Sequence, residues 1–475
     1  MSETNLVEDI PAPVEREGDL TQGPILRTLL LFSIPTLFSN LLQTLGGTIN
    51  TIWVGQLLGE KALAATANAN MVIFLGFATI YGFGMAATVK VGQYFGARDI
   101  DTARRTFGTG TGFCLGIAVG GATLGWIFAE PLLRLMATPP AIHDDALAYL
   151  RVSFLSMPFA ALSMIVGMGL RGVGDARSPL YAMILTTIAG VILNPLLILG
   201  MGPFPKLGIA GSALALALAN LLGAAAMIAW AYWRRLPLCL HGRELSYLFP
   251  SGDQLDYILR KGVPMGAQML VNSSAALVMV GLVNREGLMT TAAYGAMLQI
   301  WAYVQMPAFS ISVAVSAMVA QNIGASLHDR VGAITIAGVV TNTVITVVMT
   351  VLLILFDQPM LGLFLGEGSP AIPIAERIQL LSTWAMIATG MVMVLGGTMR
   401  AYGVVLLPLI AMAIALWPLR LGFYELAYPL IGADALWWSF TFGAAMALLL
   451  TWLVYSRPGW RRDQLGMTAA PAPAE

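Results

Sequence analysis

Twelve long apolar segments dominate the sequence and limit what the chain can fold into. A helix that crosses a bilayer needs about 20 mostly apolar residues, and every segment reaches that length, whereas transmembrane β-strands would alternate polar and apolar residues over about ten positions. Only 11% of the residues are charged, against about 25% in soluble domains. The chain is therefore predicted to be an all-α integral membrane protein. The twelve predicted spans are 25–55, 62–94, 105–129, 145–170, 178–201, 207–233, 254–284, 291–323, 331–356, 373–402, 404–430 and 434–457.

The second half of the sequence repeats the first half. Ser33-Ile34-Pro35 returns as Gly262-Val263-Pro264, Val91–Ala97 as Val319–Ala325, and Leu170–Gly174 as Met399–Gly403, with an offset along the chain that is constant to within one position. Because each half has an even number of spans, the halves share one orientation and are related by a pseudo-twofold axis along the membrane normal. The repeat predicts two six-helix lobes, with the binding site in a cleft between them. The predicted segments are a disordered tail (1–23), an N-lobe (24–237), a linker (238–252), a C-lobe (253–458) and a cytoplasmic tail (459–475).

The basic residues predict the orientation of the chain, because Lys and Arg near short loops stay in the cytoplasm. If the N-terminus is inside, 17 basic residues fall on the cytoplasmic side and 5 on the opposite side, so both termini are predicted to be cytoplasmic. The segment 1–22 lacks the basic and apolar regions of a cleaved signal. Arg420 and Glu425 are expected near the outer end of the eleventh span, where their side chains would reach the headgroups.

Several motifs resemble those of the multidrug and toxin extrusion (MATE) family of transporters, in its prokaryotic type. They are Pro35, Asn50–Gly55, the Gln-x-x-Gly-Ala sequences at Gln93 and Gln321, and Leu170–Asp175, and their order and spacing extend the resemblance over residues 24–458. The resemblance implies a V-shaped monomer in the bacterial inner membrane. It also implies antiport, in which an inward gradient of Na⁺ or H⁺ drives export of small amphipathic or cationic organic compounds by alternating access, with no cofactor besides the coupling ion.

The chain departs from the family at four positions where members of its branches carry Asp or Glu. Asn50, Asn194, Asn272 and Thr389 stand there instead, and all 25 acidic residues are expected in tails, loops or span ends. An intramembrane carboxylate is the usual carrier of the coupling ion, and it costs about 2.5 to 3.5 kcal/mol to insert. Asn can coordinate Na⁺ through its carbonyl oxygen but cannot titrate. Na⁺ coordination near Asn50 and Asn194 is therefore slightly favoured over proton coupling.

Polar side chains within the spans are the candidates for binding substrate or cation. An equally weighted alternative is that they form hydrogen bonds between neighbouring helices. Pro35 and Pro264 each interrupt a span and are expected to kink it, and the resemblance suggests that the first kink changes as the site changes occupancy. The candidate binding residues are Asn40, Gln43, Asn50, Asn194, Gln268, Asn272 and Thr389.

Three other classes of function are disfavoured. A net charge of zero excludes the basic surface that binding to nucleic acid requires, and the three His residues lie in loops, so an enzyme is not expected. A flippase or exporter for lipid-linked or amphipathic metabolites is the main alternative, but no basic residue is expected at mid-depth to hold a pyrophosphate. Nothing in the sequence favours a receptor or channel-like scaffold.

Overall fold

A computed structural model describes residues 18–136, 138–202, 204–250, 252–366, 368–457 and 459–460. Helices account for most of these residues, because only helices and closed barrels satisfy every backbone polar group inside a bilayer. The elements are α1 (Ile25–Leu58), α2 (Glu60–Gly96), α3 (Ile100–Ile127), α4 (Ala129–Leu135), α5 (Pro140–Gly172), α6 (Arg177–Leu199), α7 (Ile209–Trp233), η1 (Gly242–Leu248), α8 (Gly252–Arg285), α9 (Leu288–Gly324), α10 (His328–Leu355), α11 (Asp357–Leu365), α12 (Ile372–Ser382), α13 (Ala385–Ala401), α14 (Leu406–Ile414), the π-helical turn η2 (Ala415–Leu419), α15 (Arg420–Ile431) and α16 (Asp434–Ser456).

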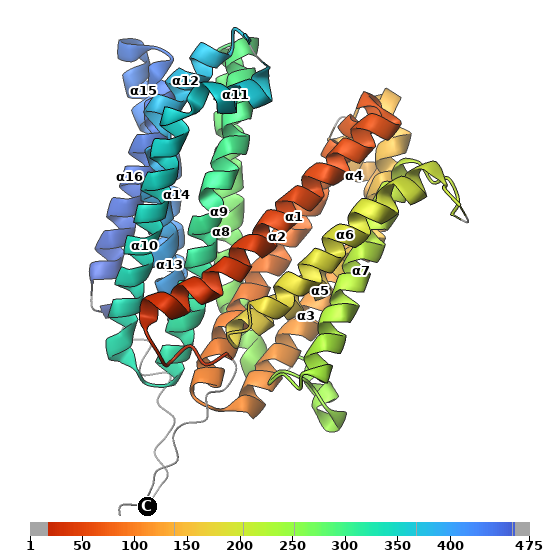
Figure 1. The fold of residues 1–475 in the computed structure, drawn as a ribbon, viewed down its shortest axis with the longest axis vertical. Coiled ribbons are helices and arrows are strands. Elements are labelled where there is room, and N and C mark those ends of the chain that lie inside the picture. Colours follow the sequence, from red (N-terminus) through yellow and green to blue (C-terminus); the bar gives the residue numbers. More distant parts are fainter. Residues whose placement is uncertain are drawn as a thin grey trace, which may run out of the picture.

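The helices form two lobes arranged as a V (Figure 1). The N-lobe contains α1–α7 and the C-lobe contains α8–α16. The lobes meet at one end, which we call the closed end, and diverge toward the other, which we call the open end. Among the described residues, eleven helices are long and apolar enough to cross a membrane, and α12 and α13 form a twelfth span with a 46° bend. The predicted all-α fold with twelve spans in two lobes is confirmed.

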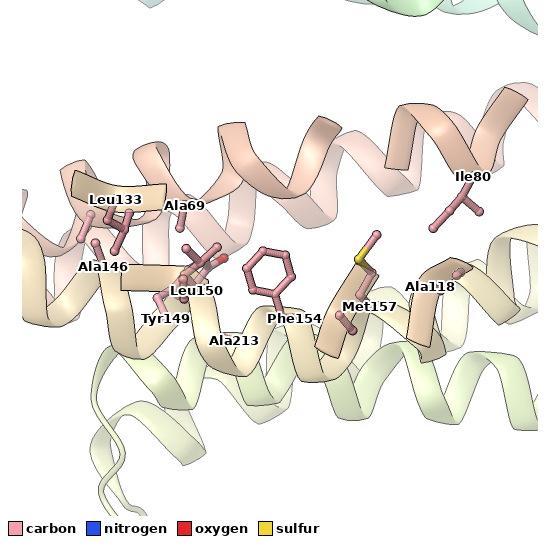
Figure 2. Packing of buried hydrophobic residues seen from close by; sticks show 14 of the residues in the cluster. Ala69, Ile80, Ala118, Leu133, Ala146, Tyr149, Leu150, Phe154, Met157 and Ala213 are labelled. Carbon is pink, nitrogen blue, oxygen red and sulfur yellow. The ribbon is translucent and has the colours of Figure 1, made fainter. Parts of the chain in front are cut away.

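Each lobe has its own hydrophobic core toward the open end. In the N-lobe, Ala146, Tyr149, Leu150, Phe154 and Met157 recur every three to four residues along one face of α5 and pack against α2 (Figure 2). This spacing places them on one side of a helix with 3.6 residues per turn. The corresponding C-lobe cluster, within the described residues, includes no residue of the N-lobe. The N-lobe cluster includes Ile258 near the start of α8, so the lobes are packed as separate units only where they diverge.

Helices α2 and α9 cross at the closed end in direct backbone contact. A Cβ atom added at Gly96 would overlap the carbonyl oxygen of Gln321, and a Cβ added at Gly324 would overlap the carbonyl oxygen of Gln93. Gly96 and Gly324 are equivalent positions of the sequence repeat. Small residues permit such close approach of membrane helices, so these two glycines set how tightly the lobes close.

Two repeat-related glutamines tie the lobes together at this crossing. Gln93 of the N-lobe donates from Nε2 to the carbonyl oxygen of Ala401 at 2.7 Å. Gln321 of the C-lobe donates from Nε2 to the carbonyl oxygen of Gly172 at 3.1 Å. Gly172 and Ala401 are themselves equivalent positions of the repeat. Each lobe therefore offers the same side chain to the same backbone position of the other lobe.

The chain preceding α1 also lies against this crossing. The backbone N–H of Leu20 donates to Oε1 of Gln321 at 2.9 Å, and Nδ2 of Asn322 donates to the carbonyl oxygen of Leu20 at 3.2 Å. Leu20 is 5% exposed. The predicted disordered tail therefore differs from the structure over residues 18–23, because Leu20 supplies the apolar side chain and backbone partners that bind it. The rest of that tail, residues 1–17, lies outside the described residues.

The linker between the lobes is bound to α3 through Arg104. Its Nε donates to the carbonyl oxygen of Pro237 at 2.8 Å, and its Nη1 pairs with Oε1 of Glu244 in η1 at 2.8 Å. The backbone N–H of His241, and then Arg104, hold the pKa of Glu244 below its ordinary value. A lowered carboxyl pKa stabilises the docked linker above that ordinary value, near pH 4.3, and the effect is lost as the pH falls through the lowered pKa.

We expect Arg104→Gln to release the linker, because it removes both contacts at once. Trypsin should then cleave after Arg243 roughly threefold to tenfold faster at neutral pH, since charge-assisted hydrogen bonds of this kind contribute about 1 kcal/mol when partly exposed. Mass spectrometry of the fragments measures the rate. Arg177→Gln, at the same end of the molecule, is the control. An unchanged rate in Arg104→Gln would show that the linker is held by other contacts.

Candidate functional site

A mostly apolar pocket with several amide side chains lies inside the N-lobe between α1, α6 and α7, with a cavity volume of about 230 Å³. Three of the predicted binding residues, Gln43, Asn50 and Asn194, line it together with Asn220. The structure brings these side chains together within the N-lobe, because α1 packs directly on α6 and α7. A binding site in the cleft between the lobes stays a prediction.

The asparagines of the pocket are oriented by hydrogen bonds to their own lobe. Oδ1 of Asn50 accepts from Oγ of Ser212 on α7 at 2.9 Å, and Nδ2 of Asn194 donates to the carbonyl oxygen of Gly190 at 3.1 Å. Oδ1 of Asn194 is buried and has no hydrogen-bond partner. Since a buried acceptor without a partner costs about 1 to 3 kcal/mol, this oxygen is available to a ligand.

Pro195 adds a second unsatisfied acceptor to the same wall. Proline has no N–H and so cannot bond the carbonyl oxygen four residues earlier in a helix, which here belongs to Val191, another lining residue. The sequence Asn194-Pro195 therefore leaves one side-chain oxygen and one backbone oxygen of the same turn of α6 without their usual donors. Proline inside a membrane helix is tolerated where other groups satisfy the freed carbonyl.

The pocket offers oxygen atoms but no charge. None of the described residues that line it is acidic or basic, and the described part of the chain holds no group of three His, Cys, Asp or Glu side chains that would bind a transition metal. Amide and carbonyl oxygens suit a hard cation such as Na⁺. They also accept hydrogen bonds from an organic solute in a mostly apolar pocket.

The other predicted binding residues do not reach this pocket. Asn40 donates from Nδ2 to Oγ of Ser310 on α9 at 3.2 Å, which is a contact between the lobes. Gln268 donates from Nε2 to the carbonyl oxygen of Val405 at 3.3 Å, within the C-lobe. Asn272 is exposed on α8, and Thr389 is half-buried on α13. The predicted site residues are thus divided among the N-lobe pocket, one contact between the lobes at Asn40, and separate C-lobe positions.

Pro35 and Pro264 lie inside the continuous helices α1 and α8. Each removes one helical hydrogen bond, leaving the carbonyl oxygens of Leu31 and Arg260 without their usual donors. The carbonyl oxygen of Pro35 in turn accepts from Oγ of Ser39 at 2.9 Å. The weakened backbone supports bending here, and the link between bending and site occupancy stays a prediction.

Helix α10 carries a buried polar stripe, Asn342, Thr346 and Thr350, which was not predicted from the sequence. Asn342, Thr346 and Thr350 are all at most 1% exposed, and both amide atoms of Asn342 and both hydroxyls lack hydrogen-bond partners. The amide of Asn342 lies against Gly390, beside Thr389. The spacing of four residues places the three side chains on one helix face, and this spacing is the signal that would have revealed them.

The position of Arg420 differs from the expectation that its side chain reaches the headgroups. The residue lies three helical turns before the end of its span at Ile431, about 16 Å along the helix, and it is only 7% exposed. The expectation that its side chain reaches the headgroups is therefore wrong. The helix path carries the guanidinium into the C-lobe, where it stacks on Phe440 at 3.7 Å from the ring centroid.

Comparison with protein families finds one family in both lobes. The family model described as MatE matches residues 35–196 and 264–424. The chain is 33% identical over 441 residues to "Probable multidrug resistance protein YoeA" of Bacillus subtilis (strain 168), covering 92% of this chain and 95% of that protein. It is 28% identical over 360 residues to a protein of Shewanella oneidensis described as "FAD transporter", covering 74% and 76%.

Solved structures share the fold. An outward-facing multidrug resistance MATE transporter of the MOP superfamily has a TM-score of 0.84 at 20% identity, covering 96% of this chain and 99% of that one. A MOP superfamily transporter from Pyrococcus furiosus, described by a reversed polarity of its binding pocket, has a TM-score of 0.83 at 21% identity with the same coverage. The two lobes, the twelve spans and the double match to one family model lead to one conclusion: this chain belongs to the MATE family, and is a membrane transporter rather than an enzyme.

Proposed function

We propose that the protein exports small amphipathic organic compounds by alternating access, with the N-lobe pocket as a binding site. This proposal rests mainly on the asymmetry of the two lobes. Hydrogen bonds from Gln93 and Gln321 join the lobes at one end, and the lobes diverge toward the other end (Figure 1). The relative named as a probable multidrug resistance protein supports export of foreign compounds. The relative named as an FAD transporter makes amphipathic metabolites the second candidate class.

We further propose that the closed end is cytoplasmic and the membrane is the bacterial inner membrane. The 17 basic residues assigned to the cytoplasm favour this orientation, and it makes the structure outward-facing. Ala141 at the open end and His328 at the closed end are both exposed.

Cysteine labelling tests the orientation. In a protein with Cys114 and Cys239 replaced by Ala, we expect Ala141→Cys to react with a membrane-impermeant maleimide on intact cells. We expect His328→Cys to react only after the cells are permeabilised. Reaction of His328→Cys from outside would reverse the orientation and with it the direction of transport.

We propose Na⁺ as the coupling ion, held by oxygens of Asn50, Asn194 and the backbone of α6. The unpartnered Oδ1 of Asn194 supports this assignment, as does the absence of acidic residues among the described lining residues. Neutral oxygens coordinate Na⁺ without titrating. Proton coupling would require the substrate itself or a group at a span end, such as Asp175 or Glu425, to carry the proton.

Na⁺ coupling and proton coupling can be distinguished in proteoliposomes, by measuring transport of a cationic dye under an imposed Na⁺ gradient or an imposed pH gradient. Because each Ala variant removes one oxygen ligand, we expect Asn50→Ala and Asn194→Ala to reduce Na⁺-driven export roughly tenfold. Asn284→Ala, at the exposed open end, is the control. Asn194→Asp should retain Na⁺-driven export and add a dependence on pH. Unchanged Na⁺-driven export in both Ala variants would eliminate the N-lobe cation site, and export indifferent to both gradients would indicate a facilitator.

A further inference from the structure

Arg420 is a buried charge without an acidic partner among the described residues. Its Nε and Nη2 are shielded from solvent and form no hydrogen bond, and no carboxylate of the described residues forms an ion pair with it. The guanidinium group lies at mid-depth of a membrane span, where ionisable side chains are rare and mark functional sites. Its position therefore needs a physical explanation.

The surrounding aromatic rings explain only part of why Arg420 is stable at this depth. Phe440 stacks on the guanidinium, and the ring of Trp301 lies 5.5 Å from that of Phe440, centroid to centroid. A desolvated cation–π contact contributes about 2 kcal/mol, whereas burying an unpaired charge costs several kcal/mol. The rings also leave the N–H groups of Nε and Nη2, which lie in the plane of the guanidinium, without acceptors. A ligand with anionic oxygens would satisfy both the charge and the donors.

The sequence repeat shows which part of the N-lobe corresponds to the surroundings of Arg420 in the C-lobe. Gly208 and Gly432 precede the last helices of the two lobes with matching backbone angles, φ 56° and ψ −131° against φ 62° and ψ −142°. Aligned on this pair, Gly443 of α16 corresponds to Ala219 of α7. In the N-lobe, Ala219 lies 3.9 Å from a Cβ placed on Gly190, and both residues line the pocket.

The same contact recurs in the C-lobe with Arg420 in place of Gly190. A Cβ placed on Gly443 would lie 3.1 Å from Cδ of Arg420. Pro179 and Pro408 stand at the offset of the repeat, and the extra residue of the π-helical turn η2 then aligns Arg420 with Gly190. Single π-helical turns often occur at functional sites. Arg420 thus occupies the C-lobe counterpart of the N-lobe pocket.

We propose that Arg420 forms a second binding site, in the C-lobe, for the carboxylate or phosphate group of an organic solute. The planar guanidinium binds such groups through paired N–H donors, and the partly exposed ring of Phe440 provides an apolar surface for the remainder of the solute. A lipid headgroup stays at the interface and does not reach this depth. The two lobes therefore differ in chemistry, with neutral oxygens in one and a cation in the other. This inference depends on the proposed export function only in taking the solute to be a transported one.

Dye binding to the purified protein in detergent tests the site without requiring transport. Fluorescein is an anion and rhodamine 123 a cation, and both have a xanthene ring whose fluorescence anisotropy rises on binding. We expect Arg420→Gln to weaken fluorescein binding by roughly tenfold or more, the effect of losing a charge-assisted hydrogen bond. Rhodamine 123 binding should be unchanged, which also shows that the variant is folded. Arg420→Lys should restore most of the affinity for fluorescein.

Two further variants make the result specific. Arg151→Gln removes another membrane arginine that stacks on a ring, that of Trp126 at 5.5 Å, and should leave fluorescein binding unchanged. Phe440→Glu places a carboxylate against the guanidinium and should abolish fluorescein binding while Arg420 remains, which answers the question if Arg420→Gln does not fold. Unaltered fluorescein affinity in either folded variant would overturn the proposal. Lost dye transport with intact fluorescein binding would instead count against the export function.

Discussion

Export should be abolished when Gly96 or Gly324 is replaced by leucine. Even the Cβ of the new side chain would overlap a carbonyl oxygen of the other lobe, so α2 and α9 could no longer cross in contact. Overpacking of this severity costs about 3 kcal/mol, or about a hundredfold in the population of the closed crossing. Because the proposed alternating access needs each end to seal in turn, a crossing that cannot close removes one of the two sealed states.

Spin labels at Arg98→Cys and Ser326→Cys report on this crossing. These repeat-related residues follow α2 and α9, and both have left-handed backbones with φ of 63° and 59°. Double electron–electron resonance should show the labels moving apart in both leucine variants. Gly120→Leu is the control, because a Cβ at Gly120 has no neighbour within 4 Å. Short label distances together with normal export in Gly96→Leu would contradict the role given to this contact.

Replacing the two glutamines should open the same end by different amounts. Gln93→Leu leaves the carbonyl oxygen of Ala401 without its donor, and the cost of about 1 to 3 kcal/mol shifts the closed population roughly fivefold to a hundredfold. Gln321→Leu should have the larger effect, since Gln321 also accepts from the backbone of Leu20 and donates to the carbonyl oxygen of Gly18.

The same pair of spin labels measures both effects, and Gln358→Leu at the exposed open end is the matched control. The fraction of molecules with a long label distance should rise in the order wild type, Gln93→Leu, Gln321→Leu. The double variant should show the largest fraction. An order in which Gln93→Leu exceeds Gln321→Leu would indicate that the segment before α1 does not contribute to closure.

The architecture and the polar residues that line the N-lobe pocket were largely predictable from the sequence. Uninterrupted apolar segments can only be membrane helices, and the constant offset of the repeat implies two lobes of equal orientation. Asn50 and Asn194 were found because polar residues at positions usually occupied by acidic ones stand out against an apolar background. Their meeting in a single pocket depends on the packing of α1 on α6, which no spacing along one helix reveals.

Contacts between the lobes and the depth of Arg420 were not predictable. The repeat identifies Gln93 and Gln321 as equivalent, but the angle at which α2 and α9 cross decides that each reaches the backbone of the other lobe. Hydropathy locates the end of a span only to within several residues, and a long charged side chain near that end is expected to extend to the headgroups. The path of α14 and α15 places Arg420 deeper, inside the lobe.

The π-helical turn η2 has a consequence for how duplicated halves diverge. Each residue of an α-helix turns the next side chain by about 100°, so one inserted residue rotates everything beyond it relative to the other half. Deleting one residue within Ala415–Leu419 would convert the turn to regular helix and swing Arg420 out of the lobe interior, without altering any other residue type. An inserted residue in one half can thus place a side chain in the lobe interior although the position at the unaltered repeat offset in the other half faces elsewhere.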